Sequence, residues 1–302
     1  MAQNLVPNGS FEDYINCPID ADNFSSVIQW NSPTAASPDY FNVCGLPNAS
    51  IPNNIFGTQS ALDGNGYAGF GLYAPPHGDY REYIQVQLTQ MLLAGQKYSV
   101  SFNVSLADES QYAIKEIGAY FSATETNSSG TSILSYIPQI QFSDSVITDT
   151  IGWINIRGYF TAQGNEQYLV IGNFNDNSNT TATIVNNIQN RLCYYYIDEV
   201  SVTEISVPLE MPTAFTPNGD NKNDIYYPVF FDSILTIREF RIYNRWGQLI
   251  HDNPTIGWNG NYKGEPQPSD VYTYYIYADI PLPDNPNERA TMRKQGSFTL
   301  LR

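Results

Sequence analysis

Polar and apolar residues alternate over many short stretches of the chain. The clearest stretch is residues 96–107, QKYSVSFNVSLA, in which every second residue from Tyr98 to Leu106 is apolar. Alternation with a period of two is typical of a β-strand with one buried and one solvated face. Similar stretches, joined by loops rich in Asn, Ser and Gly, span residues 64–73, 82–88, 117–123, 153–162, 167–174 and 194–205. Their spacing predicts a β-sandwich.

The last third of the chain carries a second series of short strands. In residues 240–250, FRIYNRWGQLI, two apolar residues alternate with polar ones, Asn244–Gly247 interrupt, and Leu249 and Ile250 resume the apolar pattern. This order predicts a β-hairpin. Together with further strands expected near 271–278 and 296–301, about seven short strands indicate an Ig-like sandwich.

We expect a linker at residues 206–212, SVPLEMP, which hold two prolines and no periodic pattern. The predicted fold is therefore all-β, with one β-sandwich over residues 1–206 and an Ig-like sandwich over residues 207–302. A chain of 302 residues, 42% of them hydrophobic, can build two such cores.

Charge is distributed unevenly between the two predicted domains. The formal net charge is −16, and residues 1–206 hold 5 Lys and Arg against 19 Asp and Glu, whereas residues 207–302 hold 9 against 11. An acidic first domain argues against nucleic acid and against anionic membrane surfaces, because both are bound by clustered Lys and Arg.

Neither a membrane-spanning helix nor a signal peptide is visible in the sequence. No run of about 18 apolar residues exists, as a spanning helix would need. Met1-Ala2-Gln3 leads directly into folded-looking sequence. For an exported protein, we would interpret this as a mature form whose signal peptide has been removed and whose start Met has been restored.

Several motifs follow one another in the last third. They are TPNGDNKND at 216–224, IYNRWG at 242–247, GWNG at 257–260, VYTYYI at 271–276 and GSFTLLR at 296–302. In this order they resemble the gliding-motility-associated, type B C-terminal sorting domain of the type IX secretion system. One departure is Asp270, where the family usually has Gly before Val271; Asp also tolerates left-handed turn geometry. The resemblance implies transport through the periplasm and across the outer membrane, to the cell surface or the medium.

The same resemblance implies partners for the second domain, namely the type IX translocon and a PorP/SprF-type barrel protein of the outer membrane. Arg241 and Arg245, with Arg302, are candidates to pair with acidic groups on such a carrier. The terminal strand, which includes Leu300, is the alternative recognition element through main-chain pairing. Trp246 joins the partner-binding candidates, although packing of the domain also suits this residue, as it suits the other tryptophan of the domain.

The first domain resembles a carbohydrate-binding-module-like jelly roll, of the galactose-binding or family 4/9/22 kind. The similarity lies in PNGSFE at 7–12 and YIDEV at 196–200. In such folds the first and last strands are neighbours, and a structural calcium often sits between the equivalents of Glu12 and Asp198. Calcium takes about six to eight oxygen ligands, which carboxylates and loop carbonyls can supply. The other interpretation is that both carboxylates only cap turns and strand ends.

A second candidate calcium site lies in the TPNGDNKND run. Asn218, Asp220 and Asp224 have a spacing that can direct oxygens inward, but Lys222 interrupts the acidic pattern and no distal Glu follows at the expected place. A structural turn is therefore the favoured interpretation.

The three cysteines suggest one disulfide and one free thiol in an exported protein. Cys17 and Cys44 would close a loop of modest length, although spacing alone does not prove that pairing. Cys193 lies in LCYYYI, where alternate residues should be buried, and is expected to be an inert core thiol.

Binding of a glycan or another surface ligand, for adhesion or nutrient capture, is the first function predicted for the first domain. Sugar rings stack on aromatic side chains while polar groups bind the hydroxyls. The candidate ligand-binding residues are Tyr73, His77, Tyr80, Arg81, Trp30 and Tyr40. The segment from Tyr73 to Arg81 is favoured because its candidates cluster, whereas Trp30 also suits the core.

Two alternatives remain for the first domain: a structural or assembly role without a small ligand and, least favoured, glycoside hydrolysis. No G-x-S-x-G motif, phosphate-binding loop or metal-binding histidine motif occurs. Asp108 and Glu109 are the best-placed acidic pair, but such pairs occur in any acidic β-sandwich. We therefore expect a protein that is not an enzyme.

Overall fold

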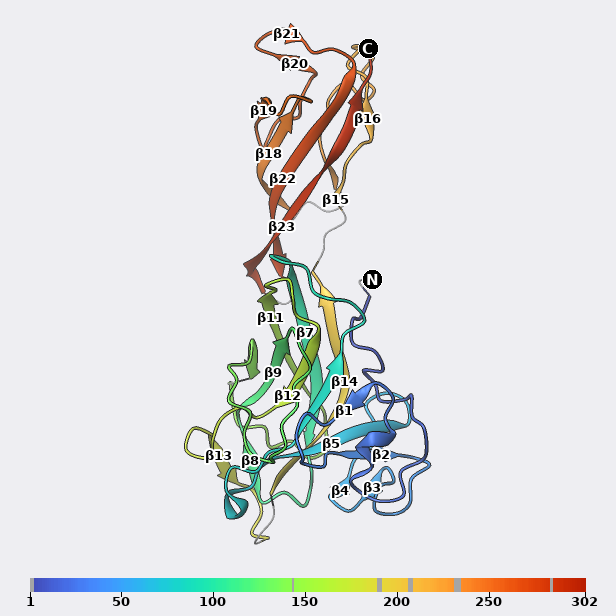
Figure 1. Ribbon diagram of the computed structural model, residues 1–302, viewed down its shortest axis with the longest axis vertical. Coiled ribbons are helices and arrows are strands. Elements are labelled where there is room, and N and C mark those ends of the chain that lie inside the picture. The colour runs from blue at the N-terminus through green and yellow to red at the C-terminus, as the bar shows by residue number, and fades with distance from the viewer. Residues whose placement is uncertain (1–2, 143, 189–191, 206–208, 231–234, 283–284) are drawn as a thin grey trace. The chain divides into compact units, whose positions relative to one another are not determined.

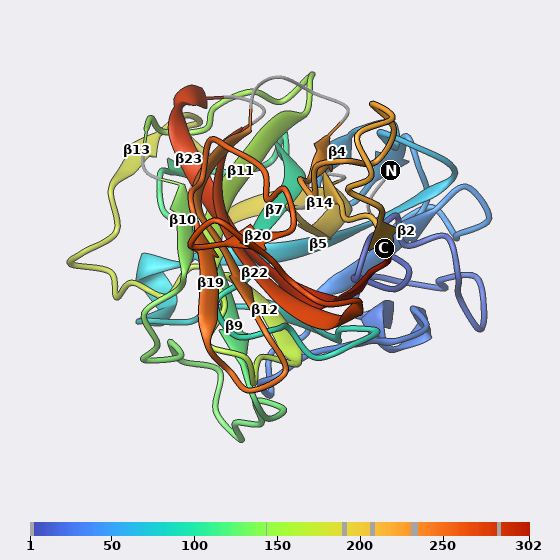
Figure 2. The same ribbon diagram turned by 90° about the horizontal axis from the view of Figure 1, so that it is seen from above.

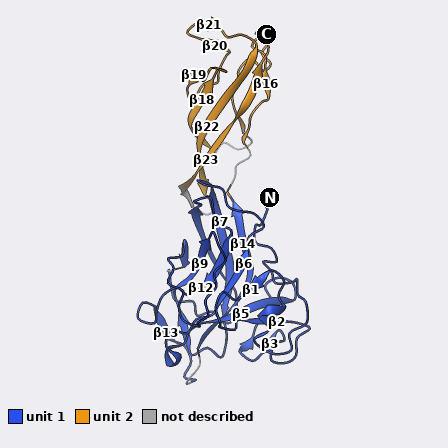
Figure 3. Cartoon of the chain, viewed as in Figure 1, with its two compact units in different colours: residues 1–204 blue, residues 205–302 orange. Residues whose placement is uncertain are grey.

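The computed structural model describes residues 3–142, 144–188, 192–205, 209–230, 235–282 and 285–302 (Figure 1). Strands hold 45% of the residues and helices 2%, which confirms the all-β prediction. The chain forms two compact units, residues 1–204 and residues 205–302 (Figure 3). The predicted boundary after residue 206 lies among residues 206–208, outside the described residues. None of the helices in the described ranges is long and apolar enough to span a bilayer.

Two five-stranded antiparallel sheets form the first unit (Figure 1). One sheet has the order β11 (Ile154–Thr161), β7 (Lys97–Leu106), β14 (Cys193–Glu204), β5 (Gly66–Tyr73) and β2 (Asp39–Asn42). The other has the order β1 (Trp30–Asn31), β6 (Tyr83–Gln87), β12 (Tyr168–Gly172), β9 (Ile117–Ser122) and β10 (Ile140–Phe142). The small elements are η1 (Asn23–Ser26), η2 (Pro75–His77), the pair β3 (Asn53–Asn54) and β4 (Gly57–Thr58), and the pair β8 (Tyr112–Ile114) and β13 (Ala182–Ile184).

The core of the first unit lies between these two sheets. The apolar residues of β7 that alternate in the sequence, from Tyr98 to Leu106, are all buried in it, and Ile84 and Ile171 reach it from the opposite sheet. The start of the chain pairs with its last strand, because the N–H of Leu5 donates to the carbonyl of Val202 at 2.8 Å. The expected neighbourhood of the first and last strands is therefore present.

The outer face of the sheet that contains β6 is covered by the segment between β9 and β10. The N–H of Leu134 donates to the Tyr83 hydroxyl at 3.0 Å, and the N–H of Thr126 donates to Gln85 Oε1 at 2.8 Å. Tyr83 and Leu134 also belong to a small buried apolar cluster on this face. The face is thereby closed to a ligand over these residues.

The second unit is built on one five-stranded sheet. Its order is β16 (Ala214–Phe215), β23 (Asn285–Leu300), β22 (Asp270–Leu282), β18 (Thr236–Tyr243) and β19 (Leu249–Asp252). Strands β22 and β23 run side by side along their length (Figure 2). Two short pairs accompany the sheet, β15 (Leu209–Glu210) with β17 (Val229–Phe230) and β20 (Asn261–Tyr262) with β21 (Glu265–Pro266). The predicted hairpin over residues 240–250 is formed by β18 and β19.

Aromatic side chains pack against the inner face of this sheet. Tyr226 stacks on Phe298 with ring centroids 3.5 Å apart, and Trp258 packs on Tyr272 at 5.0 Å. Tyr226 and Trp258 also form a β-bridge with each other. The segments outside the sheet thus provide the second layer of the predicted sandwich.

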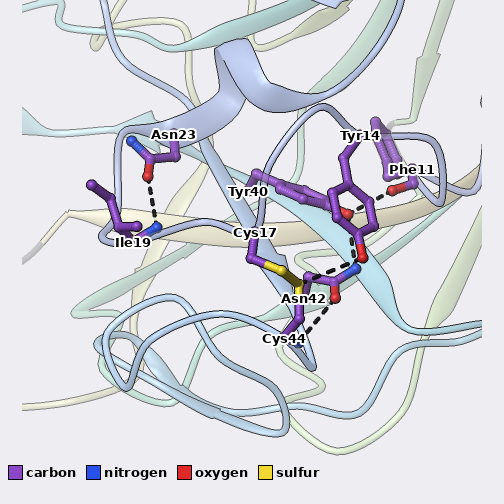
Figure 4. Close-up of a disulfide and its surroundings, with 8 residues drawn as sticks. All are labelled: Phe11, Tyr14, Cys17, Ile19, Asn23, Tyr40, Asn42 and Cys44. Carbon is purple, nitrogen blue, oxygen red and sulfur yellow. Dashed lines mark hydrogen bonds between the residues drawn. A yellow bond between two sulfur atoms is a disulfide. The ribbon is translucent and has the colours of Figure 1, made fainter.

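The disulfide between Cys17 and Cys44 is present, as expected (Figure 4). Asn42 supports it, because its Oδ1 accepts the N–H of Cys44 at 3.0 Å and its Nδ2 donates to the Tyr40 hydroxyl at 2.9 Å. Cys193 is a buried free thiol, and burial raises its pKa well above the ordinary value. The thiol is thereby kept in its protonated, weakly reactive form.

Candidate functional site

Three of the six predicted ligand-binding residues are buried. Trp30 and Tyr40 belong to the core, where the Trp30 indole N–H donates to the carbonyl of Asn8 at 2.9 Å and the Tyr40 hydroxyl donates to the carbonyl of Phe11 at 2.9 Å. Arg81 is 0% exposed. The prediction that these side chains offer open faces to a sugar is wrong for Tyr40 and Arg81, both 0% exposed, whereas Trp30 keeps 4% of its surface exposed. The indole N–H of Trp30 and the hydroxyl of Tyr40 have partners inside the protein, so the burial of these two groups costs little.

The Arg81 guanidinium joins two connections of the first unit. Its Nη1 donates to the carbonyl of Tyr80 at 2.8 Å, and its Nη2 donates to Asn177 Oδ1 at 2.9 Å and to the carbonyl of Asn175 at 3.1 Å. Its carbon Cζ also lies 5.4 Å from the centroid of the Tyr73 ring. Burial lowers the pKa of Arg81. The residue acts as an internal clamp rather than as a contact for ligand.

The remaining three candidates do not form one platform. Tyr73 packs edge-to-face on Tyr112 at 5.4 Å, whereas the Tyr80 hydroxyl donates to Glu82 Oε1 at 2.7 Å. His77 is exposed on the short helix η2. Ligand binding by Tyr73, His77 and Tyr80 stays a prediction, but their side chains have separate partners and do not present a single stacking surface.

A groove of about 400 Å³ opens elsewhere in the first unit, at the η1 turn and β1. Its buried, apolar lining residues are Phe24, Trp30, Ala36 and Pro38. Its more accessible lining residues are polar, namely Asp22, Ser25, Asn31, Ser32 and Ser37. An apolar floor with a polar rim is the usual composition of a small-ligand site. We call it the η1 groove.

Asp39, which follows the lining residue Pro38, and Glu82 are two buried carboxyl groups, and the charge of Asp39 acts on Glu82. Asp39 Oδ1 accepts the N–H of Asp22 at 2.5 Å, and Asp39 Oδ2 accepts the Tyr194 hydroxyl. Glu82 Oε2 accepts the N–H of Gly71 at 2.5 Å, and its Oε1 accepts the Tyr80 hydroxyl. Since Asp22 lines the groove, Asp39 is connected to it by a direct hydrogen bond.

Both carboxyl groups have strongly raised pKa values. Burial raises the pKa of Asp39 to about 7. Burial, and then the charge of Asp39, raises the pKa of Glu82 to about 8. Burial disfavours the charged form of a carboxyl group, and a second carboxylate nearby adds to the effect. Sequence reasoning did not single out Glu82 as part of a site. The residue follows a loop and precedes a strand, which gives no signal of burial.

The two carboxylates that the sequence predicts to bind calcium in the first unit accept hydrogen bonds from the backbone of the same loop. Asp198 Oδ2 accepts the N–H of Leu62 at 3.0 Å, and Glu12 Oε1 accepts the N–H groups of Asn65 and Gly66 at 2.7 and 2.8 Å. Between them Gly64 has φ +67°, and a Cβ there would lie 2.4 Å from the Glu12 carboxyl carbon. Residues far apart in sequence thus meet at residues 62–66.

The chemistry at this loop partly suits calcium. Burial raises the pKa of Asp198 to about 7, and burial together with the charges of Asp63 and Glu12 raises the pKa of Glu199. The charges of Glu12, Asp63 and Glu199 therefore act on one another at this loop. However, no three acidic, histidine or cysteine side chains converge on one point within the described ranges. Calcium binding stays a prediction, while loop anchoring is what these carboxylates do in the structure.

The other candidate calcium site is occupied by local hydrogen bonds. Asp224 Oδ1 accepts the N–H of Gly219 and its Oδ2 accepts the N–H of Asn221, both at 2.7 Å. Asp220 Oδ1 accepts the N–H of Lys222 at 2.8 Å, and Asn218 Oδ1 accepts the N–H of Asp220. These bonds organise the turn, in agreement with the structural interpretation that the sequence favoured. Calcium binding by Asn218, Asp220 and Asp224 stays a prediction.

Two of the partner-binding candidates in the second unit are held inside the unit. Leu300 is buried, and its strand β23 pairs there with β22 on one side and with β16 on the other. Arg302 donates through Nε to the carbonyl of Gln267 at 2.8 Å and through Nη2 to the carbonyl of Gly260 at 2.9 Å. The expectation that the end of the terminal strand is free for main-chain pairing is therefore wrong at Leu300.

The other three candidates lie at the surface, around the β18–β19 hairpin. Arg241 forms ion pairs with Glu239 at 3.1 Å and Asp252 at 3.4 Å. Arg245 pairs with Asp270 at 3.3 Å, and its Cζ lies 4.8 Å from the Trp246 ring centroid.

The two tryptophans of the second unit have opposite environments. Trp246 is 79% exposed, so the interpretation that it packs the domain is wrong. Trp258 is buried, as expected. The difference follows from position, since Trp246 lies at the tip of the hairpin and Trp258 bridges to Tyr226 beneath the sheet.

The best-placed acidic pair of the sequence does not form an isolated catalytic pair. Asp108 Oδ2 accepts the N–H of Thr58 at 2.8 Å. The N–H of Glu109 donates to the carbonyl of Phe56 at 3.0 Å. Both residues thereby help to fix the connection that contains β3 and β4.

Comparison with known families identifies the second unit. Residues 209–300 match the family described as the CHU_C type IX secretion signal domain. Such a signal sorts a protein for export by a dedicated secretion machinery, to the cell surface or the medium, and is not catalytic. The prediction that the second domain is a sorting domain of this system is confirmed. No curated protein matches this sequence.

Three solved structures that are similar to the chain each cover about two thirds of it. The CBM22-1 xylan-binding domain of Paenibacillus barcinonensis Xyn10C is 11% identical, with 64% of this chain and 99% of that chain covered and a TM-score of 0.35. A putative sugar-binding protein from Bacteroides thetaiotaomicron is 11% identical, with 67% and 100% covered and a TM-score of 0.38. The K1 cleaved adhesin domain of Lys-gingipain from Porphyromonas gingivalis is 16% identical, with 65% and 96% covered and a TM-score of 0.36. At these values the likeness carries no information on what this chain binds.

Proposed function

We propose, from the match of residues 209–300 to a type IX secretion signal, that this chain is a surface or secreted protein whose second unit is read by the type IX translocon and a PorP/SprF-type barrel protein. The first unit is then the exported cargo. The two units suit this division because each has its own buried core.

For the cargo, we propose that the η1 groove binds a glycan, as an adhesion or capture site. The supporting observation is the composition of the groove, with the apolar floor at Phe24 and Trp30 and the hydroxyl and amide groups of its rim. Sugar rings combine apolar C–H faces with many hydroxyl groups, so they fit such a lining. The volume of about 400 Å³ is within the range of small-ligand sites.

Filling the groove is expected to abolish glycan binding. Ser25 is exposed on the rim, and Ser25→Trp would place an indole over the apolar floor without disturbing a core residue. The full chain and this variant are compared on an array of oligosaccharides, and the signal should drop at least tenfold.

Ser145→Trp is the matched control, because Ser145 is exposed and does not line the groove. Loss of signal in Tyr73→Ala or Tyr80→Ala, with Ser25→Trp unaffected, would place the site at those tyrosines. Retention of the chain by no glycan would instead favour the structural or assembly role.

Calcium between Glu12 and Asp198 belongs to the same proposal as a structural ion. Glu12, Asp198 and loop carbonyls of residues 62–66 would hold it, and it would offset the charge that gathers there. The melting temperature of the full chain should then rise on adding calcium after chelation, and Asp198→Asn should remove that rise. Equal melting temperatures with and without calcium would show that Asp198 acts only through its bonds to Leu62 and Asp63.

A further inference from the structure

The outer face of the second unit's sheet is lined by aromatic and polar side chains. On the three central strands, direct neighbours form rows: Tyr243 beside Thr273 and Ser297, Arg241 beside Tyr275 and Gln295, and Glu239 beside Tyr277 and Arg293. Since facing residues of antiparallel strands project to the same side, all nine side chains share one face. We call this surface, defined by Tyr243, Tyr275 and Tyr277 with their row neighbours, the tyrosine face.

The tyrosine face is accessible to solvent over the row of Tyr243 and the row of Arg241. Thr273, Gln295 and Ser297 are exposed, and the tyrosines are half-buried. A hollow of about 460 Å³ lies on it, lined by Tyr243, Tyr275 and the small or polar residues between them. The hydroxyl groups of the three tyrosines have no hydrogen-bond partner among the described residues, whereas the hydroxyl of Tyr272 on the inner face donates to the carbonyl of Pro268 at 2.8 Å.

Trp246 extends this surface at its hairpin end. Trp246 follows Tyr243 in the β18–β19 turn, and Arg245 connects that turn to Asp270 at the start of β22. Leu249, which is paired with Tyr243, and Val271 are both partly exposed here. The result is a continuous surface with a projecting tryptophan, three tyrosines and arginines.

This composition is that of a protein-recognition surface. Trp, Tyr and Arg supply most of the binding energy at protein interfaces, because they bury a large area while keeping a polar group for a hydrogen bond. A glycan platform is less well supported. The guanidinium of Arg245 already lies over the Trp246 ring at 4.8 Å, so the indole is suited to enter a pocket rather than to stack on a sugar.

We propose that the tyrosine face and Trp246 form the docking surface through which the second unit is read by a protein of the secretion machinery. This rests on the proposed function. The occupant is a folded protein with an apolar pocket for the Trp246 indole and with hydrogen-bond acceptors opposite the free tyrosine hydroxyls. The charges on the surface are largely balanced, because Arg241 pairs with Glu239 and Asp252 and Arg245 pairs with Asp270. Recognition is therefore aromatic rather than acidic.

The test is export of the full chain in a bacterium that has a type IX secretion system. Trp246→Ala and the double variant Tyr243→Ser/Tyr275→Ser should each lower the surface and medium fraction at least tenfold and raise the periplasmic fraction. Ile256→Ser is the matched control, because Ile256 is 63% exposed and lies outside the tyrosine face. Near-ultraviolet circular dichroism of the purified chains checks that the variants have the same fold as the wild type. Tyr275→Phe removes only a hydroxyl group, so the sheet of this variant should stay folded.

The outcomes separate this inference from the function on which it rests. Export of the wild type with loss in Trp246→Ala and in Tyr243→Ser/Tyr275→Ser supports the docking surface. Export of the variants at the wild-type level overturns it while leaving the secretion signal intact. Retention of the purified wild-type chain on a glycan array, lost in Trp246→Ala, would also overturn it, since the surface would then read a glycan. Failure of the wild type to be exported would contradict the proposed function itself.

Discussion

A chain that ends at Glu204 is expected to remain inside the cell envelope, with its surface and medium fraction reduced by more than an order of magnitude. The deletion removes the whole match to the secretion signal, residues 209–300. The first unit should still fold, because the core between its two sheets contains only residues of that unit. Immunoblots of periplasm, cell surface and medium from a bacterium with a type IX secretion system measure the result.

A point variant tests whether the folded state of the signal is what matters. Trp258 packs against Phe215, Tyr272 and Phe298 at centroid distances of 5.4, 5.0 and 6.1 Å. Truncating such a residue costs about 3–5 kcal/mol, which is comparable to the whole stability of a small domain, roughly 5–15 kcal/mol. Trp258→Ala should therefore reduce export strongly, whereas Ile256→Ala, two residues away and exposed, should not.

Two results would contradict this expectation. Normal export of the chain that ends at Glu204 would show that the address lies in the first unit. Normal export of Trp258→Ala, with the second unit unfolded by circular dichroism, would show that the signal is read as an extended chain rather than as a folded surface.

The free energy of unfolding of the first unit is expected to fall as the pH rises from about 4 to about 8. Asp39, Glu82 and Asp198 have pKa values of about 7, 8 and 7 in the folded chain, all raised chiefly by burial. A raised pKa means that the folded state holds the proton more tightly than the unfolded state. The resulting stabilisation is complete below the ordinary carboxyl pKa and is lost as the pH rises through the raised values.

The free energy of unfolding of the first unit should change by a large amount over this pH range. A shift of one pKa unit corresponds to about 1.4 kcal/mol, so each of the three carboxyl groups contributes on the order of a few kcal/mol. Urea unfolding at a series of pH values in calcium-free buffer measures it. The variant Asp39→Asn/Glu82→Gln keeps the shapes of the side chains but cannot ionise, so its stability should decline much less over this range.

Asp149 provides a control with the opposite sign. Hydrogen bonds from the N–H groups of Gly152 and Ile151 lower its pKa, so its contribution is lost as the pH falls, not as it rises. Asp149→Asn should therefore leave the decline between pH 4 and 8 unchanged. A flat profile for the wild type would mean that water or a cation reaches Asp39 and Glu82 and that the pair is not enclosed.

The secretion signal could be predicted from the sequence because each of its motifs is a short, continuous segment. The turn at Asn244–Gly247 and the terminal GSFTLLR keep their order and spacing in the sequence, and they recur as the β18–β19 hairpin and the end of β23. The alternation in residues 96–107 was equally local, and it specified which side chains of β7 enter the core. Such patterns follow from the period of the backbone, which does not depend on distant residues.

The ligand-binding residues were harder to predict, because exposure is not a property of a residue type. Trp30, Tyr40 and Arg81 suited a sugar by chemistry, yet the fold gives their polar groups partners at Asn8, Phe11 and the 175–177 loop. In the second unit the sequence left two environments open for Trp246, a partner-binding surface or the packing of the domain, and the side chain is 79% exposed.

The sequence by itself determined the all-β class, the division into two domains near residue 206, the secretion signal and the buried thiol of Cys193, because each depends on local pattern or on motif order. Only the tertiary structure decided that Asp39 and Glu82 are buried close enough for their charges to interact, that Glu12 and Asp198 hold one loop, and that three tyrosines of β18 and β22 share an open face. Those arrangements depend on strand order and register, which join residues far apart in the chain and leave no trace in the spacing of any one segment.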